Sequence, residues 1–312
     1  MKKIIIISIL LLVFAAIIIG GSINNTPGIN NINPNNDVSN AIWVWGGDMY
    51  DINFTTLQES HIDTIFLNYA AVDFYGEDNI SKWIQTANNN RVKVHIWMQV
   101  LYNDDFVNPL NNGTLNIELL KNNTEDAQRY ANITGVSGIV LDYIRYPVTA
   151  SENPGGSQAI NFFVDNLTKT IKNVNPNLIV SGTLMPEETM LLVNYGQNLS
   201  NLSSTLDYII PMMYKGNYEQ NATWIESTTQ YFVSNSEGAK VIISLQTYDS
   251  DYNITELSSE EFTNDINAAY AGGAGNIGIF RYGLTNLENL DNTLTITNFI
   301  NTRLHSLTNP KI

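Results

Sequence analysis

From residue 41 onward, short apolar runs rich in β-branched residues alternate with longer segments in which apolar residues recur at helical spacing. Runs such as LIVSGTL and KVIISL are apolar on both faces, which is typical of buried parallel strands. The pattern predicts strands at residues 42–45, 64–68, 92–99, 138–142, 178–184, 208–213, 241–245 and 277–280. It predicts helices between and after them, at residues 55–60, 80–89, 117–133, 158–174, 187–199, 223–235, 260–271 and 287–304.

This alternation predicts an α/β fold. Eight strand–helix units over residues 41–305 match the roughly 250 residues of a single (β/α)8 TIM barrel, which leaves a short tail at 306–312. A doubly wound open sheet is the competing architecture. It is disfavoured because no glycine-rich phosphate loop follows the first strand, where the sequence reads WVWGGDMY.

The N-terminus has the pattern of an export sequence. Lys2 and Lys3 precede a long apolar stretch, so residues 1–22 are interpreted as either a cleavable signal peptide or a membrane anchor. Small residues at 20–22 fit a cleavage site, whereas an apolar helix over 4–23 would be about 30 Å long, enough to cross a bilayer. Both alternatives predict that the rest of the chain is extracellular or at the cell surface, in the second case anchored in the cytoplasmic membrane.

Residues 23–40 are rich in Asn, Pro and Gly and predict a flexible linker. Beyond it, N-x-S/T sequons recur, which are glycan acceptors in an exported protein but which an Asn-, Ser- and Thr-rich sequence also generates by chance. They begin at Asn53, Asn79, Asn112, Asn122, Asn132, Asn166, Asn198, Asn201, Asn221 and Asn253.

The composition of the chain excludes several classes of function. The formal charge of −15 over 312 residues excludes a nucleic-acid binder, which must present a basic surface to phosphates. The absence of cysteine excludes disulfides, thiol catalysis and Cys-based zinc sites. The three histidines, His61, His95 and His305, form no recognisable metal-binding motif, and no nucleophile elbow is present. We therefore predict no metal and no cofactor, and a monomer.

In a TIM barrel the active site lies at the carboxyl ends of the strands. The residues there are carboxylates, amides and large aromatic rings, a mixture that suits a sugar, whose apolar face stacks on aromatics while its hydroxyls need polar partners. Trp97, Tyr214 and Tyr248 also fit packed core positions, and that alternative stays open. The predicted substrate-binding residues are Asp48, Asn68, Trp97, Gln99, Tyr143, Arg145, Tyr214, Lys215, Gln246, Tyr248, Arg281 and Tyr282.

Asp142 is the first candidate for catalysis. Strand alternation puts it on the face of Val140, so it can point into the barrel mouth as the fourth strand ends. A structural pairing with Arg145 is the alternative. Glycoside hydrolysis uses two carboxylates, and Glu187 is the first choice for the second, although it also fits a helix cap. Asp249 is the next candidate, with a solvated loop position as its alternative.

Four motifs, GVSGIVLDYIRYP, VSGTLMPEE, DYIIPMMYKGNY and NIGIFRYG, resemble those of glycoside-hydrolase-like barrels of prokaryotic surface proteins. That group is distantly similar to family-18 chitinases and to the hydrolase domain of poly-N-acetylglucosamine-processing proteins. The resemblance implies a catalytic position at Asp142 and places Glu187 and Tyr214 in the site. In chitinases the fourth strand carries several acidic residues and ends in a catalytic Glu. Here Ser137, Val140 and Ile144 surround Asp142, which disfavours their substrate-assisted mechanism.

The sequence therefore predicts an exported glycosidase that cleaves a cell-surface or environmental polysaccharide with Asp142 as nucleophile or base and Glu187 as general acid. Whether the anomeric configuration is retained or inverted depends on the carboxyl separation, about 5 Å against about 6.5 to 9.5 Å. A non-catalytic glycan-binding or surface-adhesion barrel is the alternative.

Overall fold

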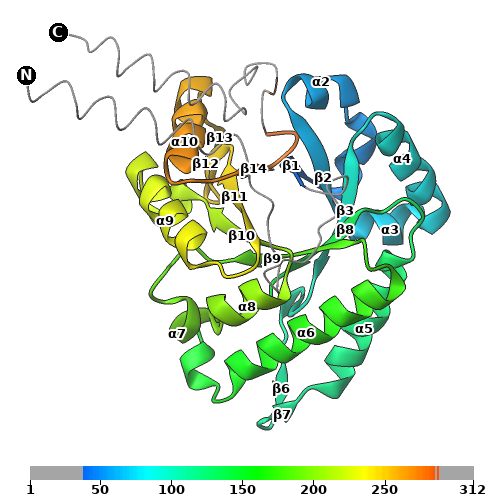
Figure 1. Cartoon of the computed structure of the whole chain (residues 1–312), viewed down its shortest axis with the longest axis vertical. Coiled ribbons are helices and arrows are strands. Elements are labelled where there is room, and N and C mark those ends of the chain that lie inside the picture. Colours follow the sequence, from blue (N-terminus) through cyan, green and yellow to red (C-terminus); the bar gives the residue numbers. More distant parts are fainter. Residues whose placement is uncertain (1–37, 285–286, 288–312) are drawn as a thin grey trace, which may run out of the picture. The chain divides into compact units, whose positions relative to one another are not determined.

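A computed structural model describes residues 38–284 and 287, and in these residues eight parallel strands close into a barrel (Figure 1). The strands follow one another around the barrel in chain order, and the last pairs with the first. They are β1 (Asn40–Val44), β2 (Ile62–Asn68), β3 (Lys93–Gln99), β8 (Gly138–Asp142), β9 (Ile179–Leu184), β10 (Tyr208–Met213), β11 (Lys240–Gln246) and β14 (Asn276–Phe280). The predicted TIM barrel is confirmed.

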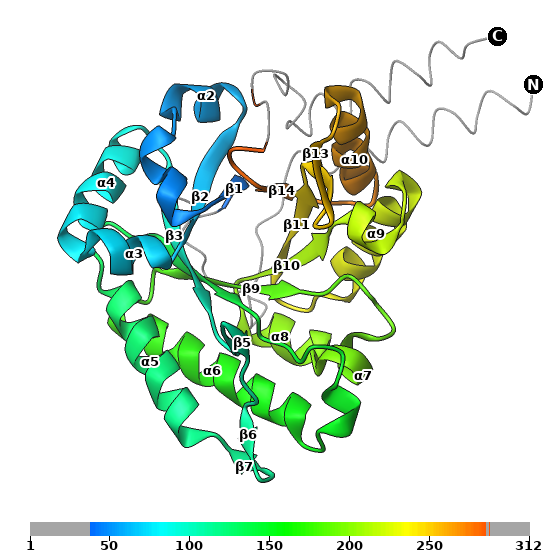
Figure 2. The same ribbon diagram turned by 180° about the vertical axis from the view of Figure 1, so that it is seen from behind.

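Helices lie outside the strands in both views (Figures 1 and 2). They are α2 (Phe54–Glu59), α3 (Ala70–Tyr75), α4 (Glu77–Asn89), α5 (Ile117–Ala131), α6 (Gly156–Val174), α7 (Leu191–Tyr195), α8 (Leu199–Thr205), α9 (Ala222–Asn235) and α10 (Ser259–Ala271). None of these helices, nor any other among the described residues, has the length and apolar character needed to cross a membrane.

Short elements fill the loops at the carboxyl ends of several strands. The 3-10 helices are η1 (Gly46–Asp51), η2 (Ala150–Glu152) and η3 (Lys215–Tyr218). Three hairpins pair β4 (Tyr102–Asn103) with β5 (Asp105–Phe106), β6 (Leu110–Asn111) with β7 (Thr114–Leu115), and β12 (Tyr248–Ser250) with β13 (Asn253–Glu256). The strand pattern predicted none of these hairpins, because each strand is at most four residues long.

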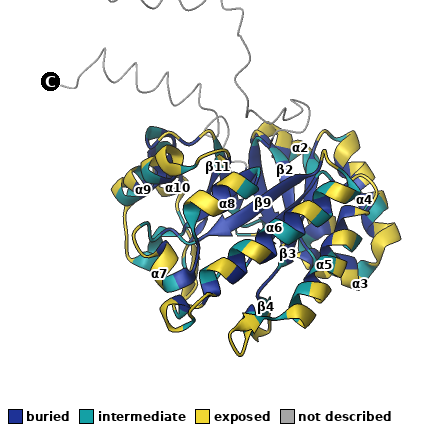
Figure 3. Cartoon of the chain, turned by 60° about the horizontal axis from the view of Figure 1, so that its bottom comes forward, coloured by how far each residue is buried: buried dark blue, intermediate teal, exposed yellow. Residues whose placement is uncertain are grey.

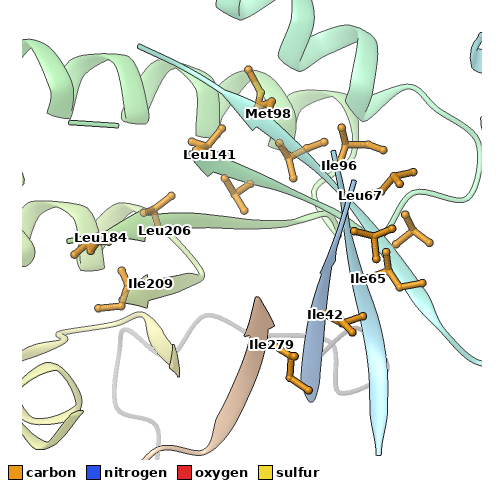
Figure 4. Packing of buried hydrophobic residues seen from close by; sticks show 14 of the residues in the cluster. Ile42, Ile65, Leu67, Ile96, Met98, Leu141, Leu184, Leu206, Ile209 and Ile279 are labelled. Carbon is orange, nitrogen blue, oxygen red and sulfur yellow. The ribbon is translucent and has the colours of Figure 1, made fainter. Parts of the chain in front are cut away.

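Two apolar layers follow from strand alternation. Residues such as Ile42, Ile96 and Leu141 belong to the large layer between the strands and the helices (Figure 4). Their neighbours along the strands, such as Trp43 and Val140, pack inside the barrel. The strands are buried, whereas the helices expose their outer faces (Figure 3). Alternation therefore fixes which residues of each strand face the interior and, at the strand end, the mouth.

The end of the barrel where the strands begin is closed. Val38 is buried there, and its backbone N–H donates a hydrogen bond to the Tyr208 hydroxyl at 3.1 Å. The ammonium group of Lys240 lies 5.8 Å from the centre of the Tyr208 ring. His95, one layer further in, is fully buried.

The predicted helix at 187–199 is wrong. The chain forms α7 and α8 instead, separated by Gly196, whose φ of +71° ends α7 in the left-handed conformation that glycine adopts most readily. Asn198 then caps α8 by accepting the Asn201 backbone N–H. Helix α3 was not predicted, and the predicted helix at 287–304 lies outside the described residues except for Leu287.

Candidate active site

A cavity of about 800 Å³ opens at the carboxyl ends of the strands, and we refer to it as the mouth cavity. Its volume is in the range of small-molecule and cofactor sites. Among the described residues, four ionisable side chains other than tyrosine line it, those of Asp142, Arg145, Asp251 and Arg281. Half of the described residues that line it are aromatic, and these are Trp43, Trp45, Trp97, Tyr143, Tyr195, Tyr214, Tyr218, Tyr248, Tyr252 and Phe280.

Asp142 is the buried carboxylate of this cavity, with 7% of its surface exposed. One oxygen, Oδ1, accepts hydrogen bonds from the Thr183 hydroxyl at 2.6 Å and from the Tyr143 backbone N–H at 2.8 Å. The other, Oδ2, accepts from the Trp97 indole N–H at 2.7 Å. A carboxylate offers about four acceptor positions, so three neutral donors orient the group and leave capacity for a ligand.

The strand register produces this arrangement. Asp142 is the last residue of β8 and pairs with Gln99 at the end of β3. Trp97 lies two residues earlier on the inward face of β3, and Thr183 comes from β9 on the other side of β8. The donors therefore come from the two strands that flank Asp142 and from its own chain neighbour. Among the described residues, Asp142 forms no ion pair with Arg145, whose guanidinium lies over the Tyr143 ring at 5.1 Å.

Trp97 is at once a core residue and a polar contact of the site. Its ring is almost fully buried and packs edge-on against Trp43, with 5.0 Å between ring centres. Its indole N–H nevertheless points to Asp142. The core position expected as one alternative for Trp97 is therefore observed, and its role in substrate binding stays a prediction.

Tyr214 faces the same space from the end of β10. Its ring stacks on Phe280 with 5.1 Å between centres, and its hydroxyl lies 3.4 Å from the Ser244 hydroxyl. Burial raises the pKa of Tyr214 well above its usual value of 10, and the negative charge of Asp142 raises it further. The phenol therefore stays protonated at neutral pH and can donate a hydrogen bond to a ligand.

Asp251 is a carboxylate of the cavity that sequence reasoning missed. It lies in the turn between β12 and β13, and its Oδ1 accepts from the Gln246 amide and the Tyr248 hydroxyl, both at 2.9 Å. The Asn217 amide donates to its Oδ2 at 2.8 Å. Burial, with a contribution from Asp251, raises the pKa of Tyr248 to about 12.

The predicted Asp249 lies two residues before Asp251 on the same hairpin. It is exposed, binds the Asn253 side-chain amide at 3.0 Å and is not among the described residues that line the cavity. The hairpin directs Asp251 to the cavity and Asp249 away from it. The motif LQTYDSD does not by itself predict the turn that causes this difference.

Glu187 lies behind the cavity wall rather than in it. Its carboxylate accepts a hydrogen bond from the Tyr195 hydroxyl, and Tyr195 lines the cavity. Burial and this bond raise the pKa of Tyr195. The helix-cap alternative for Glu187 does not hold, because α7 begins at Leu191 and has no side-chain cap.

Several predicted substrate-binding residues have partners in the protein. Lys215 forms ion pairs with Glu261 at 2.9 Å and Asp265 at 2.8 Å and does not line the cavity. The Tyr282 hydroxyl donates to the Asp51 carbonyl at 2.7 Å, also outside the cavity.

Asp48 and Arg281 form an ion pair at 3.7 Å at the rim, where Arg281 also lies over the Trp45 ring. Gln246 lies behind Asp251 and is buried. Tyr143, Arg145, Tyr214, Tyr248 and Arg281 line the mouth cavity with Trp97.

Asn68 and Gln99 line a neighbouring groove of about 490 Å³, the side groove, together with Trp45, Tyr69, Phe74 and Tyr75. Trp45 and Gln99 belong to both spaces. In the described part of the chain, no His, Asp or Glu side chains gather in threes in a way that could hold a metal ion.

Solved structures similar to this chain include several glycoside hydrolases. The PgaB (BpsB) glycoside hydrolase domain from Bordetella bronchiseptica has a TM-score of 0.67 and 12% identity, over 83% of this chain and 99% of that one. A class V chitinase from Pseudomonas fluorescens Pf-5 has a TM-score of 0.59 and 14% identity, over 83% of this chain and all of that one. The exo-β-1,4-mannosidase Op5Man5 from Opitutaceae bacterium strain TAV5 has a TM-score of 0.62 and 11% identity, over 88% of this chain and 61% of that one.

At these identities the similarity concerns the fold. No curated protein matches the sequence significantly. The family described as "Putative glycosyl hydrolase domain" matches residues 78–270, which include β8 with Asp142, β9 and β10, and the hairpin with Asp251. This match covers more than half of the chain, so the chain belongs to this glycosyl hydrolase family and is a glycosidase.

Proposed function

We propose that the protein is an exported glycosidase that cleaves a cell-surface or environmental polysaccharide with two carboxylates at the barrel mouth. The observation that carries the proposal is Asp142, which three neutral donors hold at the bottom of an aromatic cavity. Aromatic faces suit the apolar side of a sugar ring, and a fixed carboxylate suits the charge that develops at its anomeric carbon.

In this mechanism one carboxylic acid gives its proton to the glycosidic oxygen as the bond to the anomeric carbon breaks. The other carboxylate either attacks that carbon or takes a proton from the water that does. Asp142 is the proposed nucleophile or base. Asp251 is favoured over Glu187 as the second carboxylate, because Asp251 lines the cavity and Glu187 does not. Glu187 as general acid stays a prediction.

Export is supported by the sequence of residues 1–22, which lie outside the described residues. Mass spectrometry of the mature protein from its own cells separates the two forms of the proposal. A new N-terminus near residue 22 means a cleaved signal, and an intact N-terminus in the membrane fraction means an anchor. An intact chain in the cytosol contradicts export.

The release of reducing ends tests the hydrolase mechanism. Wild type is incubated with a panel of neutral and charged polysaccharides, beside Asp142→Asn, Asp251→Asn, Asp249→Asn and Glu187→Gln. We expect Asp142→Asn and Asp251→Asn to lower the rate about 10²- to 10⁴-fold, the range of a lost acid or base, and Glu187→Gln to lower it less. If Asp249→Asn has the larger effect of the two hairpin variants, the assignment of Asp251 is wrong. Sugar binding without cleavage by any form contradicts the two-carboxylate mechanism.

A further inference from the structure

The side groove continues directly from the mouth cavity. Trp45 and Gln99 belong to both, and the Trp45 ring lies 4.8 Å from the ring of Trp97, centre to centre. The Trp97 indole in turn binds Asp142. The ring of Trp45, which lines the side groove, therefore contacts the ring of Trp97, whose indole N–H donates to the proposed catalytic carboxylate of Asp142.

An exposed aromatic cluster borders the groove, and two of its members, Phe74 and Tyr75, line it. Phe74, at the end of α3, has 80% of its surface exposed, and the exposed Tyr50 of η1 lies close by. The Tyr75 ring lies between them, in edge-to-face contact with Phe74 at 4.8 Å and Tyr50 at 5.0 Å. So much exposed aromatic surface in one place is typical of a binding site.

Charged groups are directed away from the groove. Among the described residues, none that lines it is ionised at neutral pH. Asp73, the neighbour of Phe74 on α3, turns to a different surface hollow and binds Arg129 at 2.6 Å. The polar side chains that line the groove are Asn68, whose oxygen accepts the Ala70 N–H, Gln99, and Tyr69 and Tyr75 with their hydroxyls. The Tyr69 hydroxyl donates to Gln99 at 3.2 Å.

Two elements that line the groove, η1 and α3, pack directly against each other. Helix α3 follows β2 (Figure 2). Gly46 of η1 lies so close to α3 that a Cβ on Gly46 would be 2.7 Å from the backbone nitrogen of Ala71. Its neighbour Gly47 differs, since a Cβ on Gly47 would meet nothing within 4 Å. Gly47 lines the groove, so its missing side chain leaves the groove open without any packing need for glycine.

We propose that the side groove is a second sugar-binding subsite, which takes uncharged sugar units of the same glycan chain whose bond is cleaved at Asp142. The inference rests on the proposed function, because it takes the mouth cavity as the place of cleavage. It makes the substrate an uncharged oligosaccharide or polysaccharide rather than a single glycoside. The exposed ring of Phe74, with Tyr75 beside it, supplies the stacking surface, and the Gln99 amide and the Tyr75 hydroxyl meet the hydroxyls of the sugar.

The test measures binding as a function of chain length. The inactive Asp142→Asn full chain is titrated calorimetrically with oligomers of two and six units from three neutral series: β-1,4-linked N-acetylglucosamine, β-1,6-linked N-acetylglucosamine and β-1,4-linked mannose. Galacturonic acid oligomers of the same lengths are the charged comparison. Gly47→Leu and Phe74→Ala are then introduced separately. Gly275→Leu is the matched control, because a Cβ on Gly275 also meets nothing within 4 Å, and Gly275 precedes β14 at the closed end of the barrel.

We expect at least one neutral hexamer to bind about tenfold more tightly than its dimer, the effect of one or two stacked rings. Gly47→Leu and Phe74→Ala should remove most of this difference, while Gly275→Leu should keep it. Hexamers that bind no better than dimers in all three neutral series overturn the inference. So does a Gly47→Leu variant that keeps the full length dependence, and so does equal binding of the galacturonic acid hexamer.

The same measurements separate this inference from the hydrolase proposal. If length-dependent binding is lost in Gly47→Leu but the wild type cleaves nothing, the subsite stands and the proposed cleavage falls. If the wild type cleaves and the groove variants behave as Gly275→Leu does, cleavage stands and the subsite falls.

Discussion

Asp142 and Asp207 lie at opposite ends of the same parallel barrel, the first as the last residue of β8 and the second just before β10 begins. Each accepts a backbone N–H, from Tyr143 and from Val180 respectively, at 2.8 Å. Asp207 also forms an ion pair with Lys172 at 2.6 Å. In the described part of the chain, Asp142 has only neutral hydrogen-bond donors, and it lines the open mouth cavity.

The different partners of Asp142 and Asp207 show that this barrel uses a carboxylate for stability at one end and leaves a carboxylate available for catalysis at the other. At the closed end, a carboxylate is neutralised by a cation and joins β9 to β10. At the mouth, a buried carboxylate is oriented but not neutralised, which costs stability and leaves its charge available to a ligand.

The largest effect is expected from Asp142→Asn. The amide keeps the shape of the side chain but removes the charge, so we expect hydrolysis to fall about 10²- to 10⁴-fold. The amide removes a buried charge but offers one acceptor oxygen instead of two, so at least one donor that now binds the carboxylate loses its acceptor. These two effects oppose each other, and the free energy of unfolding should change by no more than about 1 to 3 kcal/mol. Asp207→Asn is the matched control and should keep its activity per folded molecule. An equal loss of activity in the two variants would contradict the assignment of a catalytic role to Asp142 and a structural role to Asp207.

Asp207→Ala should have the opposite profile. It leaves the Val180 N–H without an acceptor and Lys172 without a partner, so we expect a loss of about 1 to 3 kcal/mol in the free energy of unfolding. Asp207→Asn should lose less, because its amide oxygen can still accept from Val180. Urea unfolding of the three proteins measures both values. An unchanged stability in Asp207→Ala would show that this carboxylate is not structural.

His95 is an ionisable residue buried inside the barrel, toward the closed end, and it is expected to make the stability of the protein depend on pH. Neither ring nitrogen has a partner among the described residues, and burial, helped by the nearby charge of Lys93, lowers the pKa of His95 from 6.5 to about 3. Between these two pH values the unfolded chain binds a proton at His95 that the folded chain does not. Stability is therefore fully present above about pH 6.5 and falls with decreasing pH, by up to about 1.4 kcal/mol per unit.

At pH 5 this amounts to about 2 kcal/mol relative to pH 7. His95→Leu removes the titrating group, so its unfolding free energy should change less between these pH values than that of wild type. Urea unfolding at both pH values gives the comparison, in which the other titrating groups cancel. The same pH dependence in both proteins would mean that His95 takes up a proton in the folded state.

The sequence predicted the barrel because its strands are apolar on both faces, and their ends agree with the structure to within two residues. Alternation along a strand also placed Asp142, Trp97 and Gln99 correctly at the mouth. The side chains of a regular strand point alternately inward and outward, so their direction can be predicted without knowing which other segments they contact.

Residues beyond the strand ends could not be placed in this way. Glu187 was expected at the start of a helix that does not form, and Asp251 was overlooked in favour of Asp249 because a two-residue offset in a hairpin decides which carboxylate meets the cavity. Lys215 binds acidic residues of α10, some 46 to 50 positions away. Such loop positions are set by contacts distant in sequence, which local patterns do not contain.

Trp97 tests whether orientation of the mouth carboxylate matters apart from its charge. Trp97→Phe keeps an aromatic ring in the barrel but removes the N–H that binds Asp142 Oδ2 at 2.7 Å. A hydrogen bond to a charged group contributes about 1.5 to 3 kcal/mol, so we expect kcat to fall about tenfold or more with a smaller change in KM. Trp43→Phe is the matched variant, because the Trp43 indole donates instead to the neutral Ser244 hydroxyl at 3.0 Å. Both substitutions remove one buried indole donor from the same aromatic cluster, so both should lower the free energy of unfolding, Trp97→Phe more because its lost bond goes to a charged group. Phe at position 43 keeps an aromatic face in the cavity, so only Trp97→Phe should strongly lower kcat. Equal kcat values in the two variants would mean that the donors around Asp142 hold the strands together and do not position the carboxylate for reaction.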